Sequence, residues 1–271
     1  MTLWLAALLG LVQGLTEFIP VSSTAHLRVV PALLGQPDAG AAYTAVIQLG
    51  SLVAVLAYFA RDLVDVTVAL FRAPNTPSGR LPLMIAVGTV PVVVMGLLLK
   101  KHIEGDLRAL SVIAGALIAI GIAMAIVDRR ASMRTKYTPL SAITYTDALL
   151  VGLAQTLALV PGVSRSGATI CMALLLGFAR TDAARFSFLL SIPAVAGAGI
   201  LEAKGAFHAL GSDAIPALAV GTGVAAVTSY ASIAWLLRWL GSHQLVGFAI
   251  YRIVCGLALL AAIAAGYLQG V

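Results

Sequence analysis

Long apolar runs separated by short polar segments dominate the chain. A helix needs about 20 apolar residues to cross a bilayer, so charge-free runs near that length predict membrane-spanning helices. The last run is expected to begin ahead of its charge-free stretch, near Leu245, so that Arg252 lies inside it. The six runs are 39–60, 81–99, 109–127, 186–201, 214–237 and 253–271.

Two further apolar regions, residues 1–35 and 147–180, are interrupted. Each contains a Pro followed by a cluster of Ser, Thr and Gly. Irregular backbone survives at membrane depth only where it is buried in protein or lines a wet cavity. We therefore expect both regions to be re-entrant helical hairpins that meet inside the membrane.

The two interruptions resemble each other, and so do the segments that follow them. Residues 15–26 match residues 157–167 when the second segment carries one extra residue after its Pro. Further matches keep the same order, and all the offsets lie between 133 and 142 residues. They pair 48–55 with 188–195 and 86–89 with 219–222. This pattern indicates a duplicated unit.

Each unit contains one interrupted region and three spans. Because three is odd, the second unit enters the membrane upside down, which defines an inverted-topology repeat with broken helices. The expected fold class is an all-α polytopic membrane protein with six transmembrane helices and two re-entrant hairpins. It forms one membrane domain, residues 1–271, with a first repeat over 1–135 and an inverted second repeat over 140–271.

Composition supports the membrane class. Hydrophobic residues make up 61% of the 271 residues and charged residues 10%, with a mean hydropathy of +1.02. A soluble domain carries about a quarter charged residues, so an ordinary soluble fold and a disordered chain are both excluded. The net charge of +6 does not indicate nucleic acid, because most Lys and Arg residues lie in short loops between the apolar runs.

The loop charges also predict an orientation. Ten Lys and Arg residues fall in loops on one side, and four fall in loops on the other. Positive loops stay in the cytoplasm, so both termini and the opening of the first hairpin are expected to face outward. The ten are Arg61, Arg72, Arg80, Arg129, Arg130, Arg134, Lys136, Arg180, Arg185 and Arg238, and the four are Lys100, Lys101, Arg108 and Lys204.

A few ionisable residues interrupt the apolar segments, namely Glu17, His26, Arg165 and Arg252, with Arg28 less deep. A charge at the centre of a membrane helix costs roughly 2.5–3.5 kcal/mol on insertion scales, so such residues are functional candidates. Three of the first four lie in the two repeated interruptions, which favours one shared site.

Gln13 and Glu17 are four residues apart and would share one helix face. Their oxygens are hard ligands that suit Mg²⁺ or Ca²⁺, so a metal site is one interpretation. The alternative is a Gln–Glu hydrogen bond that fastens two helices.

A polar cluster, Ser22, Ser23, Thr24 and His26, follows the first Pro. Ser and Thr at this place are typical helix N-caps. The spacing of Ser23 and His26 also allows the imidazole to approach the Ser23 hydroxyl and take its proton, and His26 alone could attack phosphorus. A hydrogen-bonded packing histidine is the alternative.

The second interruption, residues 161–167, favours anion binding. Its two glycines, Gly162 and Gly167, admit an anion to the backbone, and Ser164 and Ser166 add hydroxyl donors at a helix N-terminus. Arg165 supplies a planar fork that grips phosphate with two parallel bonds. The alternative is a tight turn with Arg165 paired to Glu17, and the two interpretations are compatible.

These motifs resemble the bacterial undecaprenyl-diphosphate phosphatase family, also called the bacitracin-resistance protein family. Residues 13–26 resemble its first signature and residues 161–169 its second, and both are specific. Residues 47–51, 186–190 and 249–252 are similar to the family as well. The resemblance covers nearly the whole chain.

The resemblance implies an enzyme of the bacterial inner membrane that hydrolyses the C55 isoprenoid diphosphate to its monophosphate and inorganic phosphate. This reaction recycles the carrier lipid for cell-wall synthesis and removes the target of bacitracin. The implied partners are this lipid and the bilayer, with a homodimer left open, and the implied cofactor is Mg²⁺ or Ca²⁺. The site is expected to open to the periplasm.

Carried over by motif, Glu17, Ser23, His26 and Arg165 would be catalytic, and Gln13 and Glu17 would hold the metal. Whether Ser23 or His26 attacks phosphorus stays open, and a Gln at position 13 weakens a two-carboxylate metal site. The residues expected to bind substrate are Gln13, Ser22, Thr24, Ser164, Ser166, Gly167 and Thr169.

Three rival classes remain. A lipid-phosphate flippase could use the same inverted repeat, but it would not need Ser23 and His26. The type 2 phosphatidic acid phosphatases share Ser-containing turns, but their Lys–six residues–Arg-Pro element is missing here. A structural protein would leave the charges in the apolar segments unexplained.

Overall fold

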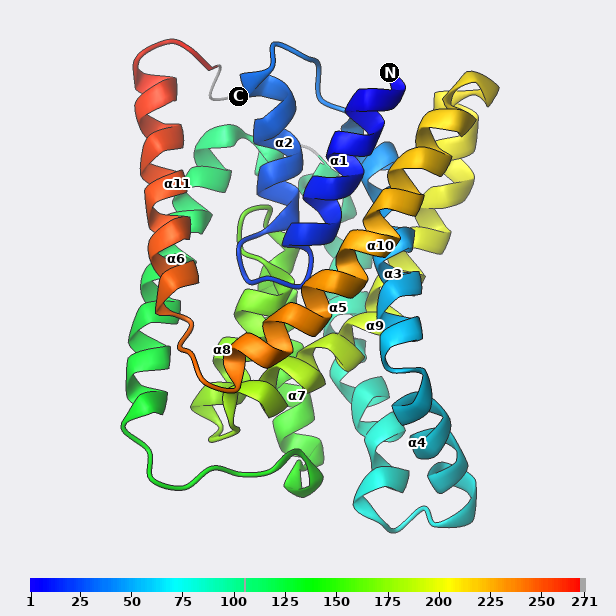
Figure 1. Ribbon diagram of the computed structural model, residues 1–271, viewed down its shortest axis with the longest axis vertical. Coiled ribbons are helices and arrows are strands. Elements are labelled where there is room, and N and C mark those ends of the chain that lie inside the picture. The colour runs from blue at the N-terminus through cyan, green and yellow to red at the C-terminus, as the bar shows by residue number, and fades with distance from the viewer. Residues whose placement is uncertain (105, 269–271) are drawn as a thin grey trace.

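The computed structural model describes residues 1–104 and 106–268 of the chain (Figure 1). In this part of the chain the regular secondary structure is helical, and the only β pairing is an isolated bridge between Thr138 and Phe178. The helices are α1 (Leu3–Thr16), α2 (Ser23–Leu33), α3 (Gly40–Tyr58), α4 (Ala60–Arg72), α5 (Pro77–Glu104), α6 (Leu110–Ser132), α7 (Tyr145–Thr156), α8 (Arg165–Leu175), α9 (Arg180–Leu210), α10 (Ile215–Leu240) and α11 (Val246–Ala264), with short 3₁₀ turns at Asp106–Arg108, Leu140–Ala142, Leu157–Leu159 and Ser212–Ala214.

Six of these helices, α3, α5, α6, α9, α10 and α11, are long and apolar enough to cross a membrane. An apolar segment in lipid must satisfy its own backbone hydrogen bonds, which is why such runs become helices. The predicted all-α polytopic class with six spans is confirmed. The chain is a multi-pass membrane protein.

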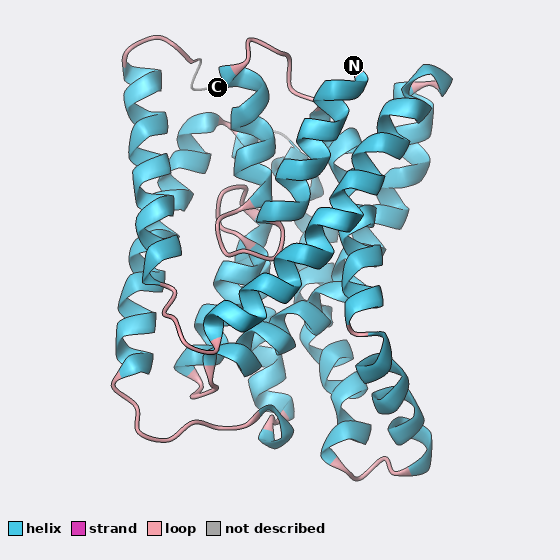
Figure 2. Cartoon of the chain, viewed as in Figure 1, coloured by secondary structure: helices cyan, strands magenta, loops and turns pink. Residues whose placement is uncertain are grey.

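The two interrupted regions each form two helices joined by a turn, and the expectation that they re-enter the membrane stays a prediction. The first consists of α1 and α2 around a turn at residues 17–22, and the second consists of α7 and α8 around a turn that begins after Leu159. Figure 2 shows both turns as loops enclosed among helices, about halfway along the molecule. Neither region is one continuous helix.

Each hairpin packs against the other half of the chain. Helix α1 packs on α10, α7 packs on α5, and the pairs α3–α9 and α6–α11 also join the halves. A Cβ at Gly10 would overlap the backbone of Gly221, and a Cβ at Gly152 would overlap that of Gly88. Gly88 and Gly221 belong to the matching segments 86–89 and 219–222, so each of these glycines contacts the hairpin of the opposite half of the chain.

The helices differ from the predicted runs mainly at their ends. Helix α9 begins at Arg180 and α10 ends at Leu240, because polar residues end an apolar run without breaking helical hydrogen bonds. The last helix covers 246–264 rather than 253–271, and residues 269–271 lie outside the described part of the chain. Arg252 lies inside α11, as expected.

One helix was not predicted. The segment 61–80, expected to be a loop, contains α4 and the first turn of α5. Helix α4 is amphipathic and has no buried residue; its exposed apolar side chains are Val64, Val68 and Phe71. Charged residues alternate with the apolar residues of α4, so the search for long charge-free runs did not predict this helix.

Asp128, a buried carboxylate on α6, makes contacts to two other helices away from the hairpin turns. Arg180 Nε lies 2.6 Å from Asp128 Oδ1, which links α9 to α6. The other carboxylate oxygen of Asp128 accepts the backbone N–H of Leu245, at 2.7 Å, ahead of α11. Arg180 therefore stabilises the packing of α9 against α6, away from the hairpin turns.

The start of α1 and the end of α11 lie at the same end of the molecule (Figure 1). The connections α4–α5 and α6–α7 lie at the opposite end, as the odd number of spans in each half requires. The positions of these connections agree with the predicted division of the loops between the two sides, in which the Lys and Arg residues were counted.

Candidate active site

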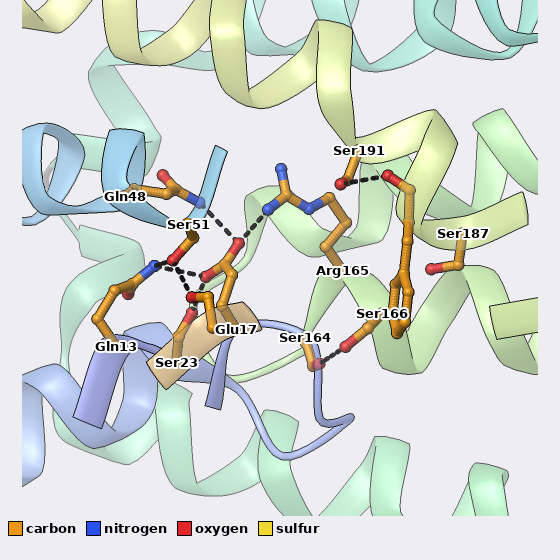
Figure 3. Close-up of polar contacts among 12 residues, drawn as sticks. Gln13, Glu17, Ser23, Gln48, Ser51, Ser164, Arg165, Ser166, Ser187 and Ser191 are labelled. Atoms are coloured by element: carbon orange, nitrogen blue, oxygen red, sulfur yellow. Dashed lines mark hydrogen bonds and ion pairs between the residues drawn. The ribbon is translucent and has the colours of Figure 1, made fainter. Parts of the chain in front are cut away.

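Glu17 is the centre of the polar cluster between the hairpin turns (Figure 3). Gln13 Nε2 and the Ser23 hydroxyl donate to its Oε2 at 3.0 and 2.6 Å. Gln48 Nε2 donates to its Oε1 at 2.9 Å, and Arg165 Nη2 donates to the same oxygen. The four donors come from α1, α2, α3 and α8, so one carboxylate joins both hairpins to the first long span.

These contacts fix the charge state of Glu17. Its side chain is only 3% exposed, and donors engage both of its oxygens. A protonated acid would have to place its own hydrogen against one of these donors. The Arg165 guanidinium compensates the charge, so Glu17 is a buried carboxylate whose oxygens are already satisfied.

The Arg165–Glu17 ion pair joins residues 148 positions apart in the sequence. It is the pairing that the sequence offered as the alternative to an anion site. Arg165 is the first residue of α8, and its side chain is 17% exposed. The structure thus brings Glu17, Ser23 and Arg165 into direct contact through the two hairpin turns.

His26 does not contact Ser23 in the way the spacing suggested. Its Nδ1 lies 2.8 Å from the Ser22 carbonyl oxygen, and its Nε2 lies 2.7 Å from the Tyr251 hydroxyl. A carbonyl only accepts, so Nδ1 carries a proton. The rings of His26 and Tyr251 lie nearly parallel, at an interplanar angle of 5°. The helix spacing placed His26 on the correct side of α2, but the side chain turns toward α11, and the Ser23 hydroxyl donates to Glu17 instead.

Three polar residues of the cluster were not predicted as site residues. Gln48 and Ser51 lie on α3, and Ser229 lies on α10. Gln13 Nε2 also lies 3.2 Å from Ser51 Oγ, and Ser229 Oγ lies 2.8 Å from the same atom. The signal in the sequence that could have identified these three residues is a polar side chain within an otherwise apolar run. Tyr251 is a fourth such residue, on α11.

The second turn is organised by its own hydroxyl groups. Ser164 Oγ accepts the backbone N–H of Gly167 at 3.2 Å and lies 3.2 Å from Ser166 Oγ. Ser166 Oγ also donates to the Ile19 carbonyl of the first turn, at 3.4 Å. The backbone N–H of Gly167, expected to meet an anion, is already engaged by the Ser164 cap.

Thr169 lies one helical turn after Arg165 on α8. Its hydroxyl lies 2.6 Å from Ser187 Oγ of α9 and 2.8 Å from the Arg165 carbonyl. The bond to Ser187 fastens α8 to α9. No contact of Thr169 tests whether it binds substrate, so this assignment stays a prediction.

Ser22 and Thr24 flank Ser23 in the chain. Ser22 is buried and offers its carbonyl to His26, while Thr24 is half-buried on the first turn of α2. Neither position tests a role in binding substrate, so these assignments stay predictions.

The metal expected at Gln13 and Glu17 stays a prediction, and the hydrogen bonds of Glu17 bear on it. Among the described residues, no group of three or more His, Cys, Asp and Glu side chains could hold a metal. Gln13 presents its Nε2 donor to Glu17, and Arg165 and Gln48 engage Glu17 Oε1. A metal at Glu17 would have to displace one of these donors.

Known proteins with similar sequences place the chain in a family. The model of the bacitracin resistance protein BacA family matches residues 6–258. An undecaprenyl-diphosphatase of Chlorobium phaeobacteroides strain BS1 is 48% identical over 282 residues, covering 99% of this chain and 100% of the relative. One of Myxococcus xanthus strain DK1622 is also 48% identical, covering 99% of this chain and 92% of the relative. With this coverage and a site built from the two motifs, the chain belongs to the bacitracin resistance protein BacA family.

Proposed function

We propose that this chain is an undecaprenyl-diphosphatase, an enzyme that hydrolyses undecaprenyl diphosphate to undecaprenyl phosphate and inorganic phosphate. The names of its full-length relatives support this substrate. The reaction returns the carrier lipid to cell-wall synthesis and confers bacitracin resistance. The observation that carries the proposal is the bond of 2.6 Å from the Ser23 hydroxyl to the buried carboxylate of Glu17, with Arg165 on the same carboxylate.

Ser23 is the nucleophile and Glu17 is its base. As Ser23 Oγ attacks the terminal phosphorus, its proton passes to Glu17 Oε2 along the existing hydrogen bond. The bond from phosphorus to the bridging oxygen breaks, and undecaprenyl phosphate leaves with the bridging oxygen and takes up the proton that Glu17 had accepted. Water then attacks the phosphoserine and gives a proton to Glu17, which passes it to Ser23 Oγ as the bond from phosphorus to Ser23 breaks, so that phosphate and free Ser23 are released.

Arg165 stabilises the charge on the transferred phosphoryl group. A guanidinium has five N–H donors in a planar fork, whereas the bond to Glu17 uses the single atom Nη2. When the diphosphate enters, Arg165 turns from Glu17 toward the phosphoryl oxygens, which leaves Glu17 a stronger acceptor for the Ser23 proton. The buried surroundings strengthen both interactions, because bulk water does not screen them.

A divalent cation fits this site only together with the substrate. Mg²⁺ is commonly held by one or two carboxylates and the phosphates of its substrate. Glu17, once released by Arg165, and Gln13 are the residues that would hold such an ion, which would supply charge neutralisation to the diphosphate. The residues of the chain perform the nucleophilic and proton-transfer steps described above.

The flippase alternative is not favoured. A carrier needs groups that bind phosphate, but it has no use for a serine hydroxyl donated to a carboxylate. The excess of Lys and Arg on the opposite side supports an orientation with the termini, and the opening of the first hairpin, in the periplasm of a bacterial inner membrane. The hairpins are then re-entrant, and the isoprenoid tail stays in the bilayer.

The decisive assay is phosphate release from undecaprenyl diphosphate by purified, detergent-solubilised protein. We expect steady release by the unaltered chain and none above background with Ser23→Ala. The same preparation with a chelator measures the contribution of a divalent cation. Absence of release by well-folded protein, with and without added Mg²⁺, would rule out the phosphatase.

A further inference from the structure

Arg252 contacts the backbone of both hairpin turns. It lies near the middle of α11 and is fully buried, with 0% of its surface exposed. Its Nη1 donates to the Pro20 carbonyl at 3.1 Å, in the first turn. Its Nη2 donates to the Gly162 and Val163 carbonyls at 2.7 and 2.9 Å, in the second turn.

The charge of Arg252 is met by carbonyl dipoles. Across residues 1–104 and 106–268 the ion pairs given by the structure do not include Arg252. A buried charge without a carboxylate partner is costly in an apolar environment. The three turn carbonyls would also be costly at membrane depth without donors. The two terminal guanidinium nitrogens and the turn carbonyls therefore satisfy each other, while Arg252 Nε is buried without a hydrogen-bond partner among the described residues.

We infer that Arg252 is a positioning residue, which holds the two hairpin turns in register so that Ser23 faces the phosphate gripped by Arg165. This inference rests on the proposed phosphatase function. Pro20 lies midway between Glu17 and Ser23 in the chain, and Val163 lies two residues before Arg165. A shift of one turn against the other thus moves the nucleophile against the phosphate anchor.

The need for such a residue follows from the other contacts between the turns. One is the Arg165–Glu17 ion pair, which must open for Arg165 to reach the substrate. Another is the long bond of 3.4 Å from Ser166 Oγ to the Ile19 carbonyl. The bonds from Arg252 do not involve any group that the substrate engages, so they persist when the ion pair opens.

Gly167 leaves room for this arrangement. A Cβ at Gly167 would lie 3.5 Å from Arg252 Nη1 and 3.3 Å from the Ser164 Cβ. The first turn of α8 thus lies directly against the guanidinium. A planar fork can bridge two turns with two separate nitrogens, whereas a lysine ammonium presents a single point of donation.

The kinetic test compares Arg252→Lys and Arg252→Met with Arg180→Met, which removes a partly buried arginine, 15% exposed, whose bonds go to Asp128 and Ser132 rather than to the turns. We expect kcat for undecaprenyl diphosphate to fall about 10-fold in Arg252→Lys and about 100-fold in Arg252→Met, because displacements near 1 Å can cost 10²-fold. KM should change less than about 3-fold, since Arg165 still binds the phosphate. Arg180→Met should lower the unfolding temperature while leaving kcat of the folded fraction unchanged.

A second measurement is independent of activity. Spin labels at Leu33→Cys on α2 and Leu175→Cys on α8, in a chain whose two native cysteines are replaced, report the distance between the hairpins. Both positions are exposed. We expect a broader distance distribution with Arg252→Lys, and a still broader one with Arg252→Met, than in the parent.

The outcomes separate this inference from the proposed function. An inactive parent chain would contradict the phosphatase function, while the distance distributions would still test whether Arg252 positions the two hairpin turns. An active parent with unchanged kcat and unchanged distances in Arg252→Lys and Arg252→Met would overturn the role of Arg252. If Arg252→Met does not fold, Arg252→Lys decides: a kcat and a distance distribution equal to those of the parent would overturn it.

Discussion

Ser22 and Ser164 share an unusual backbone conformation at matching places in the two hairpins. Their φ and ψ angles are 77° and 95° for Ser22, and 72° and 118° for Ser164. They are the two residues other than glycine with positive φ in the described part of the chain. Each precedes the first residue of a helix, which is Ser23 in one hairpin and Arg165 in the other. Strain of this kind costs about 1–3 kcal/mol and gathers at functional sites.

The two serines differ in one respect that can be tested. Ser164 Oγ caps α8 through the N–H of Gly167, whereas Ser22 makes no side-chain cap to α2. Loss of an N-cap costs about 0.5–2 kcal/mol. We expect Ser164→Ala to lower the free energy of unfolding by about 1 kcal/mol and Ser22→Ala to lower it less. Chemical denaturation in detergent measures both, and equal losses would contradict the assignment of the cap.

Ser23 and His26 should not be equivalent. Ser23→Ala removes the nucleophile, so turnover should fall by about 10³-fold or more. His26→Ala removes a side chain that bonds to Ser22 and Tyr251, so its loss should be smaller, about 10-fold to 100-fold. Phosphate release under single-turnover conditions makes the comparison. A larger loss with His26→Ala would return the nucleophile assignment to the histidine.

Glu17 and Ser23 are expected to act as one unit. If Glu17 accepts the Ser23 proton, the double variant Glu17→Gln with Ser23→Ala should be hardly slower than Ser23→Ala alone. Independent roles would instead make the two losses multiply. The assay is the same single-turnover release, with substrate binding measured separately to show that the lipid still occupies the site.

Arg165→Lys should remain strongly impaired although the charge is kept. The lysine loses the fork that meets two phosphoryl oxygens, so we expect kcat to fall about 10²-fold or more. Arg185→Lys is the control, because Arg185 pairs with Asp62 at 2.9 Å with its side chain 42% exposed. Near-normal kcat in Arg165→Lys would leave Arg165 a binding role only.

Two glycines on α10 test the packing of the halves. A Cβ at Gly221 would overlap the Tyr43 hydroxyl and lie 3.2 Å from the Ala6 carbonyl oxygen, whereas a Cβ at Gly223 meets nothing within 4 Å. We expect Gly221→Ala to lower the free energy of unfolding by about 1–3 kcal/mol. Gly223→Ala should raise it by about 0.5–1 kcal/mol, because alanine favours a helix. Thermal unfolding of the two variants checks this prediction. A shift of both unfolding temperatures in the same direction would contradict it.

Much of the fold could be read from the apolar runs, because a bilayer requires apolar helices of fixed length. The interrupted regions were recognised because Pro and Ser clusters break such runs. Helix α4 was missed, since an amphipathic helix has no long charge-free stretch. Within the site, Glu17 and Arg165 stood out by their charge in apolar surroundings.

Neutral polar residues were harder to find. Gln48, Ser51 and Tyr251 carry no charge, so the sequence alone did not separate them from residues that simply pack within spans. The partner of His26 also could not be predicted, because spacing fixes the face of a helix but not the direction in which a side chain turns. Such contacts depend on the approach of α3 and α11, which tertiary packing decides.

Gln13 allows a test of whether a divalent cation binds at Glu17 together with the substrate. Gln13 Nε2 donates to Glu17 Oε2 at 3.0 Å, so Gln13→Glu would replace a donor with a second carboxylate at the same place. Two adjacent carboxylates in a buried site can both stay ionised only when a cation lies between them. Without a cation they share a proton. We therefore expect phosphate release by Gln13→Glu to depend more steeply on Mg²⁺, and to be lost more completely with a chelator, than release by the unaltered chain, in which Arg165 already compensates Glu17. Gln48→Glu is the matched control, because it places a carboxylate against the other oxygen of Glu17, which Arg165 also contacts. Titration of Mg²⁺ against initial rate distinguishes the three proteins. If the Gln13→Glu curve coincided with that of the unaltered chain, the proposal that Gln13 and Glu17 face a substrate-borne cation would have to be abandoned.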